Sequence, residues 1–239
     1  QSAHGEMSDE YFIEVYAQNG LGGWAGPQIM AQTMSATRQV ATANGYIIIE
    51  MEDTDTGLGS GVTQTSLQLY RGALDPAPVQ LASLVDHYVI ELLANRQGVV
   101  VLLNAPLAGG DLDGSGPGIS SAEFYPFATQ QRTWSIELIG PNECGGMALS
   151  ADFDGQRLAI GCPDDRQDLG PRSGRVFLFD FDEDSNLFSD PIIISPGLPD
   201  PTFGTSVAVA GSWLMVGHAS SEASRDLVPT DLLSVYELQ

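Results

Sequence analysis

The sequence predicts an all-β fold: a β-propeller of four-stranded antiparallel blades, four or five in number. Three observations lead to this prediction. First, an apolar hairpin pattern occurs four times. Second, each hairpin is followed by a polar loop and an alternating strand. Third, the hairpins recur roughly every 50 to 60 residues, a period at which repeats form propellers or arrays. Four antiparallel strands per repeat describe a propeller blade. An apolar period of 3.6 residues never persists beyond about two turns, which excludes a helical fold.

The four hairpins are recognised by a tight turn between two apolar runs. They span residues 38–52, 87–106, 144–163 and 203–219, with turns near Asn44-Gly45, Asn95 to Gly98, Asp154-Gly155 and Ala210-Gly211. Asn-Gly and Asp-Gly favour hairpins because both central residues of the turn adopt positive φ. Runs such as YIIIE and VVVLL are typical of strands buried on both faces.

A third strand follows each hairpin, and a more irregular fourth strand follows the first three. The third strands are expected at 65–72, 122–127, 174–181 and 232–239, and the fourth strands at 76–82, 133–139 and 188–195. Segment 10–32 looks like the third and fourth strands of a blade without a hairpin before them. We therefore expect a single propeller domain over 10–239 after a flexible 1–9.

The terminal blade is then either incomplete or closed by the N-terminal strands. Closure within one chain is the favoured arrangement. The chain could instead be one section of a larger propeller, or its open strand edges could pair with a neighbouring chain, because an exposed strand edge is a template for association.

The repeats resemble those of the FG-GAP family, whose propellers include the integrin α-chain head. Phe203-Gly204 matches the "FG" element and residues 217–219 stand where "GAP" is expected. In the preceding repeat Cys144-Gly145 and residues 161–163 take these places, residues 104–106 match "GAP" in part, and the first repeat is degenerate. The resemblance implies an extracellular propeller that presents loops for adhesion, matrix contact or assembly.

Charge is the strongest feature of the composition. The chain has 31 acidic and 9 basic residues, a formal net charge of −22, and every basic residue is Arg. Such a surface repels nucleic acid and acidic membranes, so neither is an expected partner. Without an apolar run of about 18 residues, membrane insertion is not expected either.

The two cysteines are predicted to form a disulfide. If the third hairpin is centred on Phe153, Cys144 and Cys162 face each other on adjacent antiparallel strands, where disulfide geometry can be met. A disulfide would place the protein in an oxidising compartment. The alternative is two buried thiols that act as small apolar residues.

The segment 111–124 resembles a calcium loop of the EF-hand kind. Alternate oxygen-bearing residues followed by a closing carboxylate suit calcium, which binds six to eight hard oxygens. The expected ligands are Asp111, Asp113, Ser115 and Glu123. Glu123 lies one position later than the EF-hand pattern requires, and an ordinary solvated turn is the alternative.

Further carboxylates cluster after the "GAP" positions, on loops that would emerge on one face of a propeller. This acidic loop face comprises Asp53, Asp55, Asp164, Asp165 and Asp168. Such a face would attract cations or a cationic partner, and calcium or salt is expected to stabilise the fold.

Evidence for catalysis is weak, so the chain is expected not to be an enzyme. None of the three histidines belongs to a recognisable nucleophile motif, and G-x-S-x-G does not occur. His218 is interpreted as a tolerated core or loop-entry residue. A polysaccharide lyase or hydrolase is the less favoured alternative.

The partner is expected to be a protein or a glycan at an extracellular surface, with self-assembly as a further expectation. A lectin-like propeller is the main alternative to adhesion, because Trp24, Trp134 or Trp213 could stack on sugar rings. The expectation for these tryptophans is nevertheless that they pack between blades.

Overall fold

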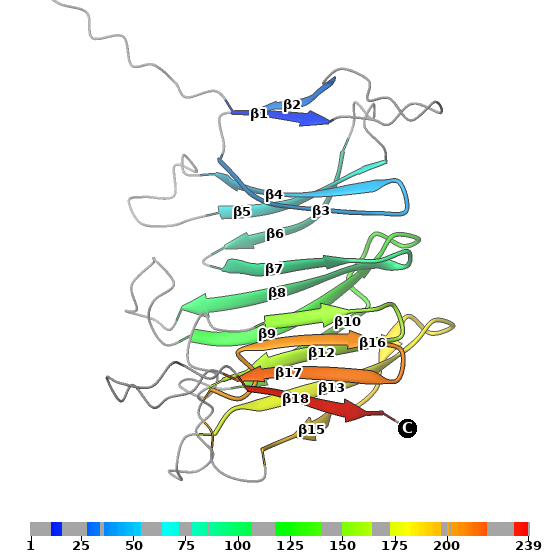
Figure 1. The fold of residues 1–239 in the computed structure, drawn as a ribbon. Coiled ribbons are helices and arrows are strands. Elements are labelled where there is room, and N and C mark those ends of the chain that lie inside the picture. Colours follow the sequence, from blue (N-terminus) through cyan, green and yellow to red (C-terminus); the bar gives the residue numbers. More distant parts are fainter. Residues whose placement is uncertain are drawn as a thin grey trace, which may run out of the picture. The chain divides into compact units, whose positions relative to one another are not determined.

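The computed structural model describes strands, turns and short connections over most of the chain (Figure 1). The described residues are 11–15, 28–33, 36–53, 64–71, 78–85, 87–106, 118–139, 150–163, 173–196, 200, 202–218 and 232–238. They contain no helix that is long and apolar enough to cross a membrane. The chain divides into two compact units, residues 1–86 and 87–239, which we treat separately.

Within the described part of unit 1 there are two antiparallel sheets. The first consists of β1 (Tyr11–Val15) and β2 (Gln28–Thr33). The second, blade 1, consists in order of β3 (Ala36–Ala43), β4 (Tyr46–Asp53), β5 (Gln64–Arg71) and β6 (Val79–Val85). Asn44 and Gly45 have φ values of 50° and 78°, which confirms the predicted hairpin turn.

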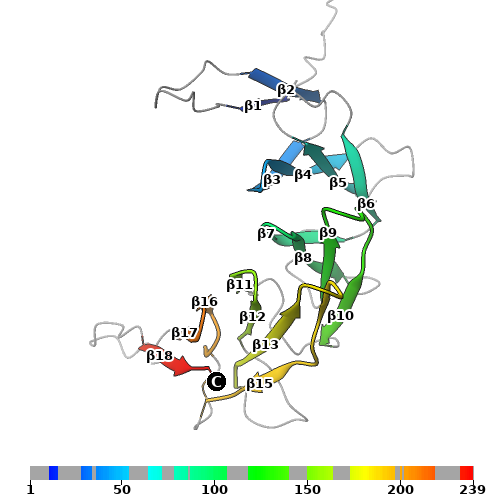
Figure 2. The same ribbon diagram turned by 90° about the vertical axis from the view of Figure 1, so that its right-hand side faces the viewer.

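The described residues of unit 2 form three antiparallel sheets, which we call blades 2, 3 and 4. Blade 2 consists of β7 (Tyr88–Ala94), β8 (Gly98–Pro106), β9 (Gly118–Pro126) and β10 (Trp134–Ile139). Blade 3 consists of β11 (Ser150–Phe153), β12 (Arg157–Cys162), β13 (Arg175–Asp182), β14 (Leu187–Phe188) and β15 (Ile192–Ile194). Blade 4 consists of β16 (Ser206–Ala210), β17 (Trp213–His218) and β18 (Leu232–Glu237). The first strand of blade 3, β11, contacts both β7 and β16 (Figure 2).

The repeat predicted from sequence is also a repeat of hydrogen bonds. In each blade of unit 2, a residue at the end of the third strand or directly after it donates its N–H to a carbonyl in the hairpin turn. These bonds join Phe127 to Gln97 at 2.9 Å, Phe181 to Gln156 at 2.7 Å, and Leu238 to Ser212 at 2.7 Å. The shared geometry fixes which residues are equivalent between blades without reference to side-chain identity.

Aromatic side chains fill the space between blades 2 and 3. Phe124 of β9 meets Phe181 of β13 at a ring-centroid distance of 5.0 Å and Phe188 of β14 at 5.4 Å. Trp134 packs on Phe179 at 5.5 Å, which confirms the expectation of inter-blade packing for this tryptophan. Edge-to-face contacts of this kind add to the free energy gained by burying the rings.

The "FG" element lies between blades 3 and 4. Phe203 is 1% exposed in a cluster with Val176 and Leu214, and Gly204 has a φ of +87°. A Cβ atom on Gly161 of blade 3 would lie 2.0 Å from the carbonyl oxygen of Gly204. A glycine is therefore required at 204 for its backbone conformation and at 161 because another backbone passes against it.

Carboxylates connect the first strands of successive blades. Glu91 of β7 accepts a hydrogen bond from the Ala151 N–H at 3.1 Å, and Asp152 of β11 accepts one from the Val209 N–H at 2.8 Å. Burial raises the pKa of Glu91 more than the bond to Ala151 lowers it, and nearby Asp152 raises it further. Each bond satisfies a first-strand N–H that the blade's own ladder leaves free.

The structure confirms the all-β propeller fold, and the described residues of blade 4 form three strands. The prediction of a single domain over 10–239 is not tested. The two-stranded sheet of β1 and β2 agrees with the pair of strands expected within 10–32. Residues 1–9 lie outside the described part of the chain. Closure of blade 4 by the N-terminal strands and pairing of open strand edges between chains stay alternative predictions.

Candidate functional site

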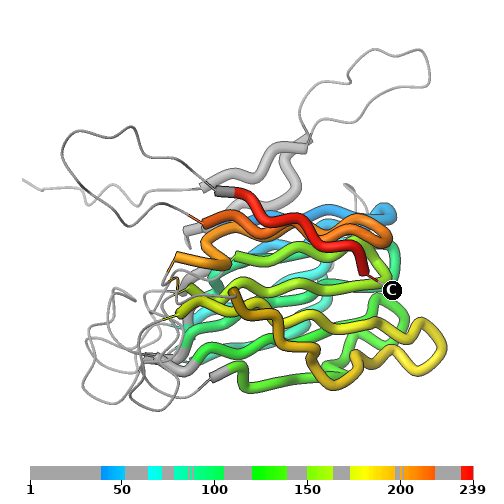
Figure 3. Tube along the Cα trace, turned by 60° about the horizontal axis from the view of Figure 1, so that its bottom comes forward, coloured from blue at the N-terminus to red at the C-terminus, as the bar shows by residue number. Residues whose placement is uncertain are grey.

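The hairpin turns of blades 2, 3 and 4 gather at one end of unit 2, on the right of Figure 3. They line two adjoining hollows of about 570 and 580 Å³, which together we call the turn-end groove. Gln156, Glu183 and Gly211 line both hollows. The remaining lining residues are Asn95, Arg96, Gln97, Asp154, Gly155, Arg157, Asp180, Phe181, Ala210, Ser212 and Leu238.

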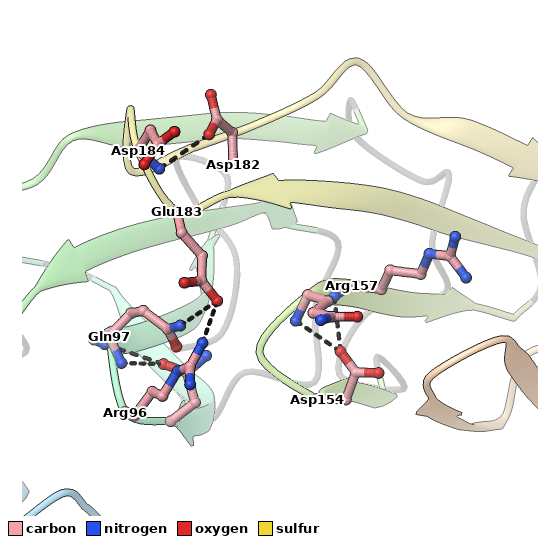
Figure 4. A network of polar contacts seen from close by, with 10 residues as sticks. Arg96, Gln97, Asp154, Arg157, Asp182, Glu183 and Asp184 are labelled. Carbon is pink, nitrogen blue, oxygen red and sulfur yellow. Dashed lines mark hydrogen bonds and ion pairs between the residues drawn. The ribbon is translucent and has the colours of Figure 1, made fainter.

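The first two turns of the groove are held by the same side-chain device. In blade 2, Oδ1 of Asn95 accepts hydrogen bonds from the N–H groups of Gln97 at 2.8 Å and Gly98 at 3.1 Å. In blade 3, Oδ1 of Asp154 accepts them from Gln156 and Arg157, each at 2.8 Å (Figure 4). Asn and Asp favour such turns because a short side chain reaches its own backbone two residues on.

Glu183, in the turn between β13 and β14, connects blade 3 to blade 2 (Figure 4). Its Oε1 accepts hydrogen bonds from Arg96 at 2.5 Å and from Nε2 of Gln97 at 2.8 Å. The Arg96 and Glu183 side chains are 72% and 45% exposed, so the ion pair contributes little to folding stability. Both charged groups stay accessible in the groove.

Arg157 and Asp154 connect blade 3 to blade 4. The Gly211 N–H donates to Oδ2 of Asp154 at 2.8 Å, and the Gly211 carbonyl accepts from Arg157 at 3.0 Å. Arg157 also donates from Nε to Asp180 at 2.9 Å. Three turns from three blades are thereby fixed in one arrangement.

The groove also contains unused hydrogen-bonding capacity. Among the described residues, Nδ2 of Asn95 and Oε1 of Gln97 are buried atoms with no hydrogen-bond partner. Both lie beside Gly155, where a Cβ atom would approach them at 3.3 and 3.7 Å. An unmatched donor and acceptor at the wall of a polar hollow favour a ligand rich in hydrogen-bonding groups.

A carboxylate outside the lining belongs to the same turn as Glu183. Hydrogen bonds from the Ser185 hydroxyl at 2.7 Å and the Asp184 N–H at 3.0 Å hold the pKa of Asp182 below its usual value. Asp182 is therefore ionised at neutral pH and adds negative charge beside the groove. Over the described ranges, no three His, Cys, Asp or Glu side chains are grouped as a metal site would require.

The predicted calcium ligands are only partly within the described residues. Asp111, Asp113 and Ser115 lie outside them. Glu123, in β9, is 8% exposed, forms an ion pair with Arg132, and accepts a hydrogen bond from the Tyr125 hydroxyl at 2.5 Å. Burial and the bond to Glu123 raise the pKa of Tyr125. Calcium binding stays a prediction, and Glu123 would have to exchange these partners to take part.

The acidic loop face is not tested by the described residues. Four of its residues lie outside the described part of the chain, namely Asp55, Asp164, Asp165 and Asp168. The fifth, Asp53, is the last residue of β4, and the structure does not describe its side chain.

Cys162 is fully buried and disulfide-bonded. Its predicted partner, Cys144, lies outside the described residues, so the pairing itself stays a prediction. The geometric reason given for it was wrong, however. Phe153 pairs with Leu158 and Ser150 with Gly161, so the hairpin is not centred on Phe153, as that reasoning required.

His218 has partners that the sequence did not reveal. Its Nδ1 lies 2.6 Å from Oδ2 of Asp200, and its Nε2 lies 3.4 Å from Oγ of Ser234. The order Asp, His, Ser is that of a hydrolase triad. Ser234, however, lies within a regular strand and at the limit of hydrogen-bonding distance, so we interpret the group as a tie between the loop before β16 and blade 4.

Asp200 is held by several donors in this tie. Burial acts to raise the pKa of its carboxyl, but hydrogen bonds from the Thr202 hydroxyl and N–H, together with His218, outweigh burial and lower it. Asp200 is therefore ionised at neutral pH.

The groove residues Arg96, Gln97 and Glu183 were missed by sequence reasoning. The hairpin turns were predicted, but their convergence was not. Aligning the turns of blades 2 and 3 on their Asn or Asp position would have identified the shared turn device, since Asn95 and Asp154 occupy equivalent places.

Comparison with known proteins supports the fold alone. No family model and no curated protein sequence matches the chain. Among solved structures, the chain is similar to the β-propeller domain of the Trilobed protease from Pyrococcus furiosus, for which an open velcro topology is described. The TM-score is 0.54 at 10% identity, covering 85% of this chain and 54% of that one. The chain thus has a β-propeller fold and spans little more than half the length of the propeller it matches.

Proposed function

We propose that this chain is a non-catalytic, extracellular interaction module of the FG-GAP type, and that it holds a protein ligand for adhesion or matrix contact in the turn-end groove. The observation that carries the proposal is the convergence of three hairpin turns, cross-linked by hydrogen bonds, onto one polar surface. Loops positioned by a rigid β scaffold are common binding sites.

The chemistry of the groove suits a peptide segment of mixed charge. Arg96 and Arg157 could meet carboxylates, while Asp180 and Glu183 could meet basic side chains. Because the turns are already held by Asn95 and Asp154, binding would cost little ordering of the backbone.

The packing of the "FG" element supports the FG-GAP assignment. Phe203 fills the space between blades, and Gly204 takes a positive φ against a glycine of the preceding blade. The disulfide at Cys162 supports an extracellular location, because such bonds persist in oxidising compartments. Calcium at the 111–124 segment is proposed to stabilise the fold rather than to act in binding.

The test is binding of the labelled 239-residue chain to immobilised extracellular-matrix proteins and to a glycan array. We expect binding to at least one matrix protein, weakened by ten-fold or more when Arg96→Ala and Glu183→Ala are combined, as expected for loss of charged contacts. Asp190→Ala is the matched control, since this exposed carboxylate lies outside the groove. Binding that is equal in the groove variant and the control would refute the proposed site.

The second candidate is a lectin-like propeller. Trp213 is 48% exposed, and amide and carboxylate side chains such as Gln97 and Asp154 are suited to sugar hydroxyls. Glycan binding that is lost in Trp213→Ala or in the groove variant, without binding to any matrix protein, would favour this candidate.

A further inference from the structure

The outer edge of β18 differs from the corresponding edge in the other blades. In blades 1, 2 and 3 the third strand pairs with a further strand: β5 with β6, β9 with β10, and β13 with β14 and β15. β18 pairs with β17 through six consecutive residue pairs, and no strand among the described residues pairs with its other edge.

This edge also lacks the features that protect strand edges from association. The pairings of β6 and β10 each contain a register shift, and the outer strand of blade 3 is broken into β14 and β15. The pairing of β18 contains no shift. Its sequence, LLSVYE, has one charged residue and no proline, whereas bulges, charges and prolines are the usual means of blocking an edge.

The backbone groups on the open edge can be assigned from the ladder. Leu238 donates its N–H to Ser212 of the β16–β17 turn at 2.7 Å. Because hydrogen-bonded residues alternate along an antiparallel strand, Tyr236 and Ser234 bond to β17, and the N–H and C=O groups of Leu233 and Val235 point to the open edge. The Leu233 and Val235 side chains are 63% and 55% exposed.

We propose that β18 pairs antiparallel with the β18 of a second copy of this chain across a twofold axis. Two identical strands that pair antiparallel are related by such an axis, so one edge supplies both halves of the contact. A pair centred on Val235 brings Val235 opposite its copy and Leu233 opposite Glu237. The one charged side chain of the strand then faces an apolar neighbour rather than another carboxylate.

The apolar face of blade 4 adds to this contact. Trp213 and Met215 of β17 are 48% and 40% exposed on the same face as Leu233 and Val235. In the pair, the Leu233 and Val235 side chains of one copy shield those of the other from water. The net charge of −22 opposes association, so salt strengthens the pairing. The residues of β18 itself, Leu232 to Glu237, do not line the turn-end groove.

The experiment is sedimentation equilibrium of the 239-residue chain over roughly 1 to 100 µM, at low and high sodium chloride. We expect a monomer–dimer equilibrium that shifts toward the dimer with salt. Val235→Pro removes an outward N–H from both copies without touching the ladder to β17, and weakens dimerisation about a hundredfold. Val235→Ile keeps both that N–H and an apolar β-branched side chain, and dimerises like the native chain.

A second measurement covers the case in which Val235→Pro does not fold, which circular dichroism reveals. Hydrogen exchange of the Leu233 and Val235 amides in the native chain slows as protein concentration rises. A chain that stays monomeric throughout, a dimer that Val235→Pro leaves unchanged, or exchange rates independent of concentration overturns the proposal. None of these results bears on ligand binding, because no groove residue is altered.

Discussion

Blades 3 and 4 have the same strand register but opposite exposure on one face. Ala159, Val176 and Leu178 of blade 3 are 0%, 0% and 3% exposed. The equivalent residues of blade 4 are Met215, Leu233 and Val235, which are 40%, 63% and 55% exposed. The two sets are similarly apolar, so side-chain type does not explain the difference.

The difference arises from what lies against each face. The blade 3 face is covered by Phe203, Val209, Leu214 and Val216 of the next repeat. Asp152 also bonds to the first strand of blade 4, whereas Ala208 occupies the equivalent position in blade 4 and carries no acceptor. An apolar strand residue on this face therefore stabilises the fold only when a following blade covers it.

The largest expected effect concerns the glycines that precede Cys162 and His218. A Cβ atom on Gly161 would lie 2.0 Å from a backbone oxygen of Gly204, whereas on Gly217 it would meet the Ser206 side-chain oxygen at 2.1 Å. We expect Gly161→Ala to lower the free energy of unfolding by about 3 kcal/mol or more and Gly217→Ala by about 1 kcal/mol. Urea denaturation measures both, and equal losses would show that the blade 4 backbone does not constrain blade 3.

Truncating equivalent apolar side chains gives the next effect. Leu178→Ala opens a cavity between blades and should cost about 3 kcal/mol. Val235→Ala removes an exposed group and should change stability by no more than about 0.5 kcal/mol in dilute solution. The comparison uses urea denaturation at a low protein concentration. A large loss for Val235→Ala there would mean that its face is covered within the monomer.

Removing the carboxylate between the blades should have a smaller effect. Asp152→Ala leaves the Val209 N–H without its acceptor and should destabilise the chain by about 1 to 2 kcal/mol. Asp190→Ala, at an exposed position, serves as the control and should be near neutral. If both variants unfold at the same urea concentration, the bond contributes nothing to holding the blades together.

The smallest expected effect is the pH dependence of the Asp200–His218 tie. The pKa of Asp200 is lower in the folded than in the unfolded chain. The ionised carboxylate therefore stabilises the fold, and this stabilisation is fully present when the pH is above the pKa of Asp in the unfolded chain, about 3.9. That stabilisation is lost as the pH falls through the pKa of Asp200 in the folded chain.

Thermal unfolding from about pH 6 downward, in the native chain and in Asp200→Asn, measures this contribution. The native chain should have the higher Tm above about pH 4, and the difference should narrow in more acidic solution. A constant difference across this range would mean that the ionised carboxyl is not what stabilises the loop.

The hairpins show how far local sequence determines this structure. Asn44-Gly45 and Asp154-Gly155 were predicted as turns because few residues adopt positive φ, and Gly155 and Gly45 indeed have φ values of 101° and 78°. The alternation of β13 likewise predicted its strand. The location of Glu183 beside Arg96 could not be predicted, because the two residues come from different repeats and meet only when the blades pack.

The sequence by itself determined the repeat, the turns with the glycines that their positive φ requires, and the strand order within each blade. These depend on backbone conformation and on neighbours within one hairpin. Only the tertiary structure decided that Val176 is buried while Leu233 is exposed, that His218 meets Asp200, and that three turns form one groove. Those features depend on contacts between segments that are distant in the sequence. Composition and periodicity do not encode such contacts, because the same apolar pattern fits both a blade face that is covered and one that is open.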